Sequence, residues 1–448
     1  MIKIGVAKVD YTPEIGLPLM GNFRDDYDAR GVHDPLFAKA IVFADDSGGK
    51  AAMLLMDICM LDRNNVSMMR EFISSQCDIA GENILIAATH THSGPAPAQF
   101  GSLPPADEKA VEAFLKKASE AVLKANDVLK ASSLAIGYTR EDRVSFYRRL
   151  KCKDGKTHMN WERLDPDFVV EPLGTIDPEL ITLTIEQQGN AEAALVNFGL
   201  HPAILSGDNW LYSADYPGYL AEAMGRIFGE NFETIFCQGC CGNVNHIDYK
   251  DKTQGRGYQM TQRVGYMLAV AAQEAMKRRT KVSTDMVVVA SEKVALKHAV
   301  ITEEQYTWCK DVLAKAGTNP AKGQIDGLPD EHYAKMCLDM YEKQNQNDYV
   351  EVMTIRIGDI AIVGLPGEIF CEFGMAIKHH SPAKHTLVLE LANDSIGYIP
   401  TIESFEQGGY EPATGSTMYQ PGAGEKLVRS AFNQLSKLPP SKLGGFIG

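Results

Sequence analysis

Residues 84–95 read ILIAATHTHSGP, an apolar run that passes directly into two histidines. Short runs rich in Ile, Leu and Val are typical of strands buried on both faces of a sheet. Seven further stretches share this character: AKAIVFAD (38–45), AAMLLMDIC (51–59), LAIGYT (134–139), AALVNFGL (193–200), MVVVASEKVAL (286–296), MTIRIGDIAIVGL (353–365) and TLVLEL (386–391). The sequence therefore predicts a fold built around buried β-sheets.

Helical patterns separate these runs. Residues 108–130 place Val111, Phe114, Leu115 and Ala118 on one helical stripe. Similar patterns predict helices over 62–75, 217–228, 257–277 and 424–437. The alternation predicts an α/β fold with mixed, largely buried β-sheets covered by helices.

The chain reads as one large catalytic domain over residues 1–440, with 441–448 as a C-terminal tail. Segment 302–347 differs because it is polar. It is predicted to be helical in two pieces, separated by the Gly-, Pro- and Asn-containing stretch 317–329. We interpret it as a helical insertion or cap over the core.

The composition narrows the classes of partner and compartment. With 44 Lys and Arg against 58 Asp and Glu, the net charge is −14, which disfavours nucleic acid and anionic membranes as general partners. No apolar run approaches the roughly 20 residues that span a bilayer. Nine cysteines without paired spacing indicate a reducing compartment. The start MIKIGVAKVDYTP lacks a signal-peptide core, so we expect a cytoplasmic protein, or a secreted or periplasmic one if a leader has been removed.

Several predicted strands end in a potential metal ligand. The first quoted run leads into His90 and His92, AALVNFGL into His201, and IAIVGLPG into Glu368, while TLVLEL precedes Tyr398. Ligands of α/β proteins gather at the carboxyl ends of strands. Two histidines and one carboxylate leave a position open for water, as in catalytic zinc sites. If these side chains share an ion, the imidazoles of residues 90 and 201 lie within about 8 Å of each other.

Each candidate also has an ordinary interpretation. In an extended chain, residues 90 and 92 face the same way, so one histidine binds metal while the other contacts the reacting group, or both ligate, or both are loop histidines. Alone, His201 reads as a structural histidine and Glu368 as a solvated carboxylate in a turn. Their parallel placement at strand ends favours the metal site.

The ordered motifs resemble the neutral/alkaline ceramidase family. They are GVAKVDYTPEIGLPLMGN (5–22), ARGVHDPLFAKAIVF (29–43), ATHTHSGPAP (88–97), NFGLHP (197–202), DYPG (215–218), LPGE (365–368), NDSIGY (393–398) and GGYE (408–411). The order and spacing are similar to the amino-terminal catalytic domain of that family over nearly the whole chain.

The resemblance implies a zinc amidase that cleaves the N-acyl bond of a sphingoid lipid. It implies zinc ligation by His90, His201, Glu368 and Tyr398. It also implies catalytic roles for His92 beside the zinc, Tyr410 at the oxyanion, Arg148, for which Arg149 competes, and Asn245. Both the implied zinc ligands and the implied catalytic residues are assigned from the positions of the family's motifs in this sequence.

The loop CQGCCGNVNH (237–246) departs from the family pattern, because Asn245 stands where a serine is expected and Asn243 where an aspartate is expected. Its cysteines also suggest a second metal site, but a structural site normally needs four ligands, so small buried cysteines in a tight glycine-rich loop are favoured. Asp57 either orients a ligating histidine or caps a helix.

Three functions follow from these observations. The first is a zinc-dependent amidase that acts on an N-acyl lipid or another small acylated compound. The second is a zinc esterase or deacylase of a small polar or sugar substrate, to which the polar segment 302–347 is suited. The third, motivated by Asn245, is a metal-binding homologue without catalysis.

Overall fold

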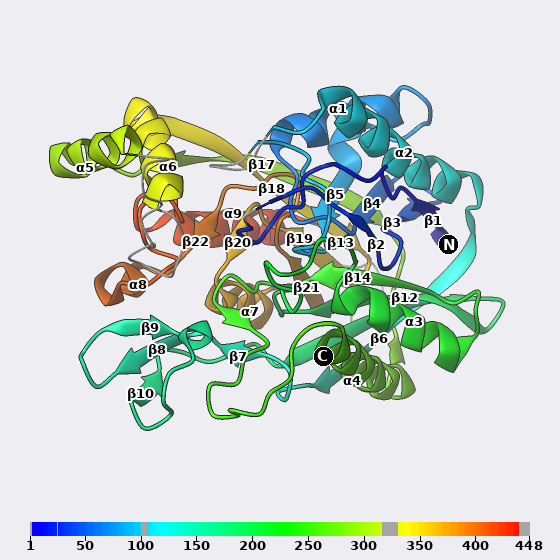
Figure 1. The fold of residues 1–448 in the computed structure, drawn as a ribbon. Coiled ribbons are helices and arrows are strands. Elements are labelled where there is room, and N and C mark those ends of the chain that lie inside the picture. The colour runs from blue at the N-terminus through cyan, green and yellow to red at the C-terminus, as the bar shows by residue number, and fades with distance from the viewer. Residues whose placement is uncertain (1, 25, 100–104, 316–329, 439–448) are drawn as a thin grey trace.

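Two β-sheets lie face to face, and helices cover their outer faces (Figure 1). The computed structural model describes residues 2–24, 26–99, 105–315 and 330–438. One apolar core lies between the sheets and includes Ile41, Met53 and Leu85 from the larger sheet and Ile355 and Leu387 from the smaller one. Strands covered on both faces need apolar side chains on both faces, which explains the nearly continuous apolar runs of the sequence.

The larger sheet runs through strands from both halves of the chain. Its order is β14 (Glu233–Gln238), β12 (Asn190–Phe198), β11 (Glu179–Gln187), β6 (Lys130–Arg140), β1 (Ile2–Asp10), β3 (Phe37–Asp45), β4 (Lys50–Met56) and β5 (Ile84–Ala88), with β16 (Thr280–Lys281) paired to β6. The pairs β4–β5 and β12–β14 are parallel, and the others are antiparallel.

The smaller sheet is mostly antiparallel and contains β17 (Val287–Lys297), β18 (Asn347–Ile357), β19 (Ile360–Gly364) and β21 (His385–Leu389), in that order. The register of β17 and β18 runs from Val287 opposite Ile357 to Lys297 opposite Asn347. The final strand, β21, lies parallel to β19.

Amphipathic helices bury one side against each sheet. On the larger sheet lie α1 (Arg63–Ser74), α2 (Glu108–Asp127), α3 (Tyr216–Phe228) and α4 (Tyr258–Lys277), and on the smaller sheet lie α7 (Cys371–His380) and α9 (Ala423–Lys437). Helix α1 begins after Asp62, whose carboxylate accepts a hydrogen bond from the Asn65 N–H, as an N-cap does. No helix in the described part of the chain has the length and apolarity of a bilayer span.

Short elements surround the ends of the sheets. They are β2 (Gly31–Val32) with β13 (Leu211–Tyr212), β7 (Phe146–Tyr147) with β15 (Val244–Asn245), β20 (Glu368–Ile369) with β22 (Tyr398–Ile399), the sheet β10 (Val169–Pro172), β8 (Arg149–Cys152) and β9 (Thr157–Met159), helix α8 (Ile402–Gln407), and 3-10 turns at Gly81–Asn83 and Asn160–Glu162. The connection from β17 to β18 carries α5 (Glu303–Ala314) and α6 (Asp330–Lys343).

The segment after β21 ties opposite sides of the larger sheet together. The Glu390 N–H donates to the Gln238 carbonyl at the end of β14 at 3.1 Å. The Leu391 carbonyl accepts a hydrogen bond from the Ala88 N–H of β5 at 3.3 Å, and the Asn393 N–H donates to the Ile86 carbonyl at 2.7 Å. The segment thereby connects the end of β5 with the end of β14, which pairs with the end of β12 on the other side of the sheet.

The predicted fold class is confirmed, including buried sheets covered by helices. The run 353–365, expected as one strand, is a hairpin of β18 and β19 that turns at Gly358, whose φ is +53°. Strands β1, β11 and β14 and helix α7 were not expected from the sequence. Two helices form within 302–347 as expected, while the stretch 317–329, which was expected to separate them, lies outside the described residues. The assignment of residues 1–440 as one catalytic domain stays a prediction, and residues 441–448 also lie outside the description.

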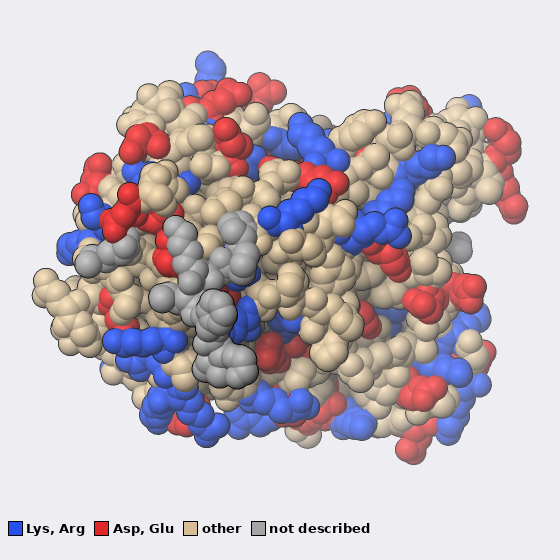
Figure 2. Space-filling view, turned by 180° about the vertical axis from the view of Figure 1, so that it is seen from behind, with Lys and Arg blue, Asp and Glu red and all other residues tan. Residues whose placement is uncertain are grey.

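Acidic and basic side chains are interspersed over the face shown in Figure 2. Both signs of charge are therefore present on that face, in a chain whose net charge is −14.

Two glycines give opposite predictions for stability. A Cβ at Gly137 of β6 would lie 2.0 Å from the Ala275 carbonyl oxygen of α4, so the helix packs directly on the strand backbone. A Cβ at Gly225 of α3 would meet nothing within 4 Å. We expect Gly137→Ala to lower the free energy of unfolding by about 1–3 kcal/mol through overpacking. Gly225→Ala should raise it by up to about 1 kcal/mol through helix propensity. Chemical denaturation of both variants would check this, and equal effects would contradict the packing argument.

Candidate metal centre and catalytic site

Three buried side chains from distant parts of the chain meet at one point. The Nε2 atoms of His90, after β5, and His201, after β12, lie 2.9 Å apart. The Glu368 Oε2 atom, on β20, lies 3.5 Å from each of these nitrogens. The distance between the two imidazoles is far below the 8 Å limit set from the sequence. The structure thus brings together three of the predicted ligands within one group of atoms.

The hydrogen-bond partners of the Nδ1 atoms of His90 and His201 determine which ring nitrogen carries the hydrogen. The His90 Nδ1 atom lies 2.7 Å from the Cys59 carbonyl oxygen, and the His201 Nδ1 atom lies 3.2 Å from the Cys241 carbonyl oxygen. A carbonyl oxygen only accepts, so in the neutral rings we assign the hydrogen to Nδ1. The two Nε2 lone pairs then face each other, an arrangement that requires a cation or a shared proton between them.

The carboxylate and the charges fit a cation at this point. The Glu368 Oε2 atom is buried and makes no hydrogen bond to any described residue, a costly state for an anionic oxygen without a positive partner. Although burial favours a neutral ring, Cys59 and Glu368 raise the pKa of His90 well above its ordinary value. Burial and the neighbouring His90 lower the pKa of His201 well below it. The two pKa values are thus shifted in opposite directions, as happens where two buried rings compete for one positive charge.

Tyr398, the predicted fourth ligand, stands next to the Glu368 carboxylate. Strands β20 and β22 pair in parallel with Glu368 opposite Tyr398, and the Tyr398 hydroxyl is hydrogen-bonded to the Glu368 carboxylate. Burial and the charge of Glu368 raise the pKa of Tyr398 well above its ordinary value. Two imidazoles, a carboxylate and a phenol oxygen form a donor set suited to zinc.

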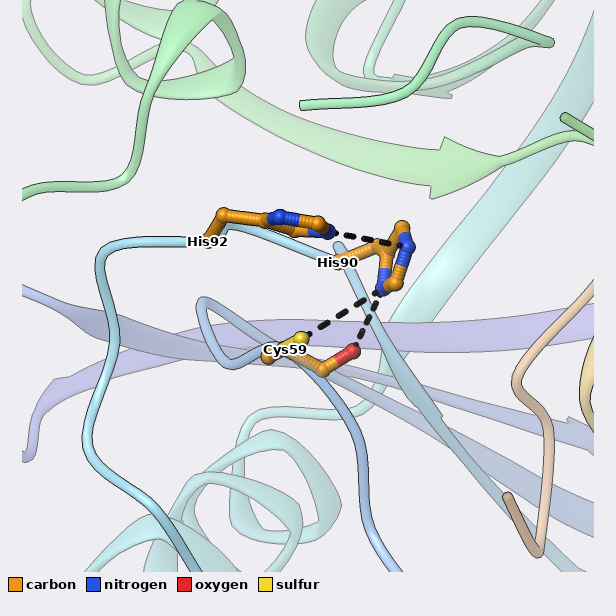
Figure 3. A group of neighbouring side chains, drawn as sticks. All are labelled: Cys59, His90 and His92. Carbon is orange, nitrogen blue, oxygen red and sulfur yellow. Dashed lines mark hydrogen bonds between the residues drawn. The ribbon is translucent and has the colours of Figure 1, made fainter. Parts of the chain in front are cut away.

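His92 lies beside this group. Its Nε2 atom is 3.3 Å from the His90 Nε2 atom, and its Nδ1 atom is 3.4 Å from the Asn22 Oδ1 atom. Figure 3 shows its ring directed toward His90, whose other side contacts Cys59. His90 has a φ of +72°, so the chain is not extended here. The two rings nevertheless converge. Gly21 is required for this packing, since a Cβ there would lie 2.4 Å from the His92 ring.

Cys59, His90 and His92 form a second possible group of ligands. The His90 nitrogen on the Cys59 side already bonds the Cys59 carbonyl oxygen at 2.7 Å. The group with His201 and Glu368 is therefore the better candidate, because it uses ring nitrogens that are not bonded to carbonyls.

Arg148 is placed behind the two tyrosines. Its guanidinium carbon lies 5.2 Å from the centroid of the Tyr398 ring and 5.9 Å from that of the Tyr410 ring. Its Nε atom donates to Glu411 Oε1 at 2.7 Å, while Arg149 donates to Glu411 Oε2 at 2.8 Å. Of the two arginines that the sequence left in competition, Arg148 is thus the one beside the tyrosines.

Asn245 is buried but does not line the active-site cavity described below. Its amide forms a reciprocal pair with that of Asn160, with distances of 2.7 and 2.8 Å, and its Oδ1 atom also accepts the Ile247 N–H. Among the described residues, its polar atoms are therefore engaged within the protein. The role implied for Asn245 at the substrate stays a prediction.

The cysteine-containing loop is tightly packed. Cys237, Cys240 and Cys241 are buried, and a Cβ at Gly242 would lie 2.5 Å from the Glu368 carbonyl oxygen. No cluster of potential ligands in the described chain includes these cysteines. The interpretation as small buried cysteines is the one the geometry supports.

Asp57 takes neither of the roles considered for it. Its carboxylate accepts the Phe37 N–H at 2.9 Å and lies 3.4 Å from the Thr89 hydroxyl oxygen. Asp62 caps α1, and the Cys59 carbonyl orients His90. Asp57 therefore links β3 to the end of β5.

Sequence reasoning missed Glu390, which supports two ligands at once. Its Oε2 atom accepts the N–H groups of Cys241 and Ile369 at 3.1 and 2.8 Å, and its Oε1 atom accepts the Cys241 thiol at 2.7 Å. Cys241 bonds His201 through its carbonyl, and Ile369 follows Glu368. Burial raises the pKa of Glu390 to about 7. The available signal was one acidic residue within the apolar run TLVLEL.

Arg24 was also missed. It is buried and donates from Nη2 to the His92 carbonyl at 3.0 Å and from Nε to the Asn209 carbonyl at 3.0 Å. It therefore holds the loop that presents His92.

A cavity opens over the ligand group. Its lining includes His90, His92, Glu368, Tyr398 and Tyr410, so the predicted metal and catalytic side chains share one space. Residues from the loop after β1 and from α6 complete its walls.

Comparison with known proteins places these residues in context. The family model for neutral/alkaline non-lysosomal ceramidase, N-terminal, matches residues 2–257, a range that includes His90, His92, Arg148 and His201. The neutral ceramidase of Pseudomonas aeruginosa is 22% identical over 97% of this chain and 71% of its own length. Neutral ceramidase B of Dictyostelium discoideum is 22% identical over 99% of this chain and 72% of its own. The crystal structure of the Pseudomonas aeruginosa enzyme shares the fold, with a TM-score of 0.75 and 20% identity over 98% of this chain and 76% of that one.

Removal of one ligand should abolish metal binding. We expect the wild-type protein to retain stoichiometric zinc and His90→Ala to lose it, because a single imidazole and a carboxylate hold zinc poorly. Metal analysis of purified protein checks this, with the exposed His380→Ala as control. Full zinc content in His90→Ala would exclude this site.

Glu390 should tune metal affinity without being a ligand. We expect Glu390→Gln to lower zinc affinity by about 10- to 100-fold, since it reverses one hydrogen bond under His201 and Glu368. Competition with a chelator measures the affinity, and the exposed Glu403→Gln serves as control. An unchanged affinity would show that Glu390 only fills space.

Proposed function

Because the chain belongs to the neutral/alkaline non-lysosomal ceramidase family, we propose that it is a zinc-dependent amidase that hydrolyses an N-acyl bond. The observation that carries this proposal is the pair of facing Nε2 atoms of His90 and His201, with the Glu368 carboxylate beside them. Curated relatives named neutral ceramidase support an amide as the bond and ceramide as one candidate substrate.

The residues fit a zinc ion, and Tyr398 is proposed as its fourth protein ligand. When bound, zinc polarises the substrate carbonyl and makes water more acidic. The remaining chemistry belongs to side chains of the chain.

His92 is the proposed proton carrier. Its Nδ1 atom faces the side-chain amide oxygen (Oδ1) of Asn22 and keeps its hydrogen, so the lone pair on Nε2 can accept the proton of the attacking water. A C–O bond forms at the acyl carbon, the C–N bond breaks, and His92 returns the proton to the leaving amine. The products are a carboxylic acid and an amine.

Tyr410 is proposed to donate a hydrogen bond to the oxyanion, since it lines the cavity on the same side as Tyr398. Arg148 acts through both tyrosines, because its guanidinium lies against their rings and is held by Glu411. We regard it as a positioning residue that keeps positive charge near the developing oxyanion.

A second candidate is an esterase or deacylase of a small polar substrate, which would use the same groups. The pairing of Asn245 with Asn160 supports it, because an amide committed to the protein leaves less to recognise a ceramide. A panel of N-acyl lipids, acylated sugars and simple esters separates the two. Zinc binding without hydrolysis of any member would support a homologue without catalysis.

A mutation should distinguish the role of His92 as proton carrier from the role of the metal ligands. We expect His92→Asn to retain zinc but to lose about 10²- to 10⁴-fold in kcat, the usual contribution of a positioned acid–base group. Zinc content and kcat measured on the same preparation check this. Wild-type turnover in His92→Asn would remove the residue from the mechanism, and loss of zinc would make it a ligand.

A further inference from the structure

The first turn of α6 forms part of the cavity wall above the metal ligands. His332 and Tyr333 line the same cavity as His90 and Glu368, although they come from the connection between β17 and β18. The function proposed above assigns these two residues no task. A wall that faces the reacting atoms contacts whatever acyl compound enters.

The position of this wall is fixed by contacts away from the cavity. Buried Cys309 of α5 and Ala334 and Cys337 of α6 share an apolar cluster. Tyr306 and Tyr341 stack at a centroid distance of 4.1 Å across the two helices.

The helix pair is also attached to the loop that follows Tyr410. The Gln305 Nε2 atom donates to the Thr414 hydroxyl at 3.2 Å. Gly415, with a φ of +97°, packs so closely on α6 that a Cβ there would lie 3.2 Å from Tyr333. Tyr333 is thus held at a set distance from the catalytic side chains.

The wall around Tyr333 is mostly apolar. Met20, Phe23, Tyr27 and Met60 line the cavity with it. The ring of Phe23 meets that of His332 edge-on at a centroid distance of 4.8 Å. Burial lowers the pKa of His332 to about 4, so the ring is neutral near pH 7 and adds no charge to this wall. Such a surface suits the hydrocarbon part of an acyl group rather than a charged amine.

The space is small. The cavity has a volume of about 90 Å³. An enclosed cavity of about 150 Å³ holds one benzene molecule, and drug-sized ligands need about 300–1,000 Å³. The volume within these walls matches an acyl group of about two to four carbons, and a long fatty-acyl chain would have to reach beyond them.

We propose that this cavity is an acyl pocket and that Tyr333 and His332 of α6 limit its occupant to a short acyl group. The inference rests on the proposed amidase function and names its substrate class, which is short-chain N-acyl compounds. Ceramides with long acyl chains are then poor substrates of this chain.

A series of amides with one common amine and acyl groups from acetyl to hexadecanoyl tests the pocket. We expect wild-type kcat/KM to be highest between acetyl and butanoyl and at least tenfold lower for octanoyl. In Tyr333→Ala the ratio of kcat/KM for octanoyl to that for acetyl should rise at least tenfold. Tyr333→Phe keeps the ring and should retain the wild-type profile, as should Lys335→Ala, which alters an exposed residue on the same helix.

Binding of the acid products gives a second readout. Calorimetry on the zinc-loaded protein should show that Tyr333→Ala binds octanoate at least tenfold more tightly than the wild type does, with butanoate binding changed less. A wild-type preference for hexadecanoyl, or equal profiles for wild type and Tyr333→Ala, would overturn the acyl pocket while leaving the amidase intact. Absence of turnover for every amide in the series would overturn the proposed function itself, and the pocket with it.

Discussion

Two imidazole nitrogens that face each other at 2.9 Å, with a carboxylate oxygen 3.5 Å from both, form the constraint around which this molecule is organised. Two lone pairs in a buried space repel each other, and a buried carboxylate oxygen without a donor, such as Glu368 Oε2, is costly. Only a positive charge relieves both conditions. The backbone carbonyls of Cys59 and Cys241 enforce the arrangement from behind, because they orient both rings with the same nitrogen inward.

Holding these groups together is a task of the whole fold. His90 and His201 follow strands on opposite sides of the larger sheet, and Glu368 follows a strand of the smaller one. The segment after β21 joins these places through backbone hydrogen bonds to β5 and β14. Glu390, in the same segment, fastens the loop under His201 and the residue after Glu368. The segment after β21 therefore both connects the sheets and supports the candidate metal ligands.

The sequence predicted those features that depend on residues close together in the chain. An apolar run followed by His or Glu is visible in the chain itself, so the candidate ligands His90, His201 and Glu368, which the structure brings together, could be predicted, as could the long amphipathic helices. Glu390 could not, because its partners lie 149 and 21 residues away and its neighbours in sequence are apolar. Asn245 shows the converse, since its motif position suggested contact with substrate, whereas its amide is paired with Asn160, 85 residues earlier. Strand β11 was overlooked because its polar threonines, Thr182 and Thr184, interrupt an otherwise apolar run.

The register of β17 and β18 has an evolutionary consequence. The two strands pair without interruption up to Lys297 opposite Asn347, so both ends of the connection that carries α5 and α6 leave from a single rung of the ladder. Such a connection is an exchangeable module, because it can be shortened, lengthened or replaced by another loop without a change in strand register. A chain of this fold can thus acquire a different cavity wall while the strands that carry the candidate metal ligands keep their register.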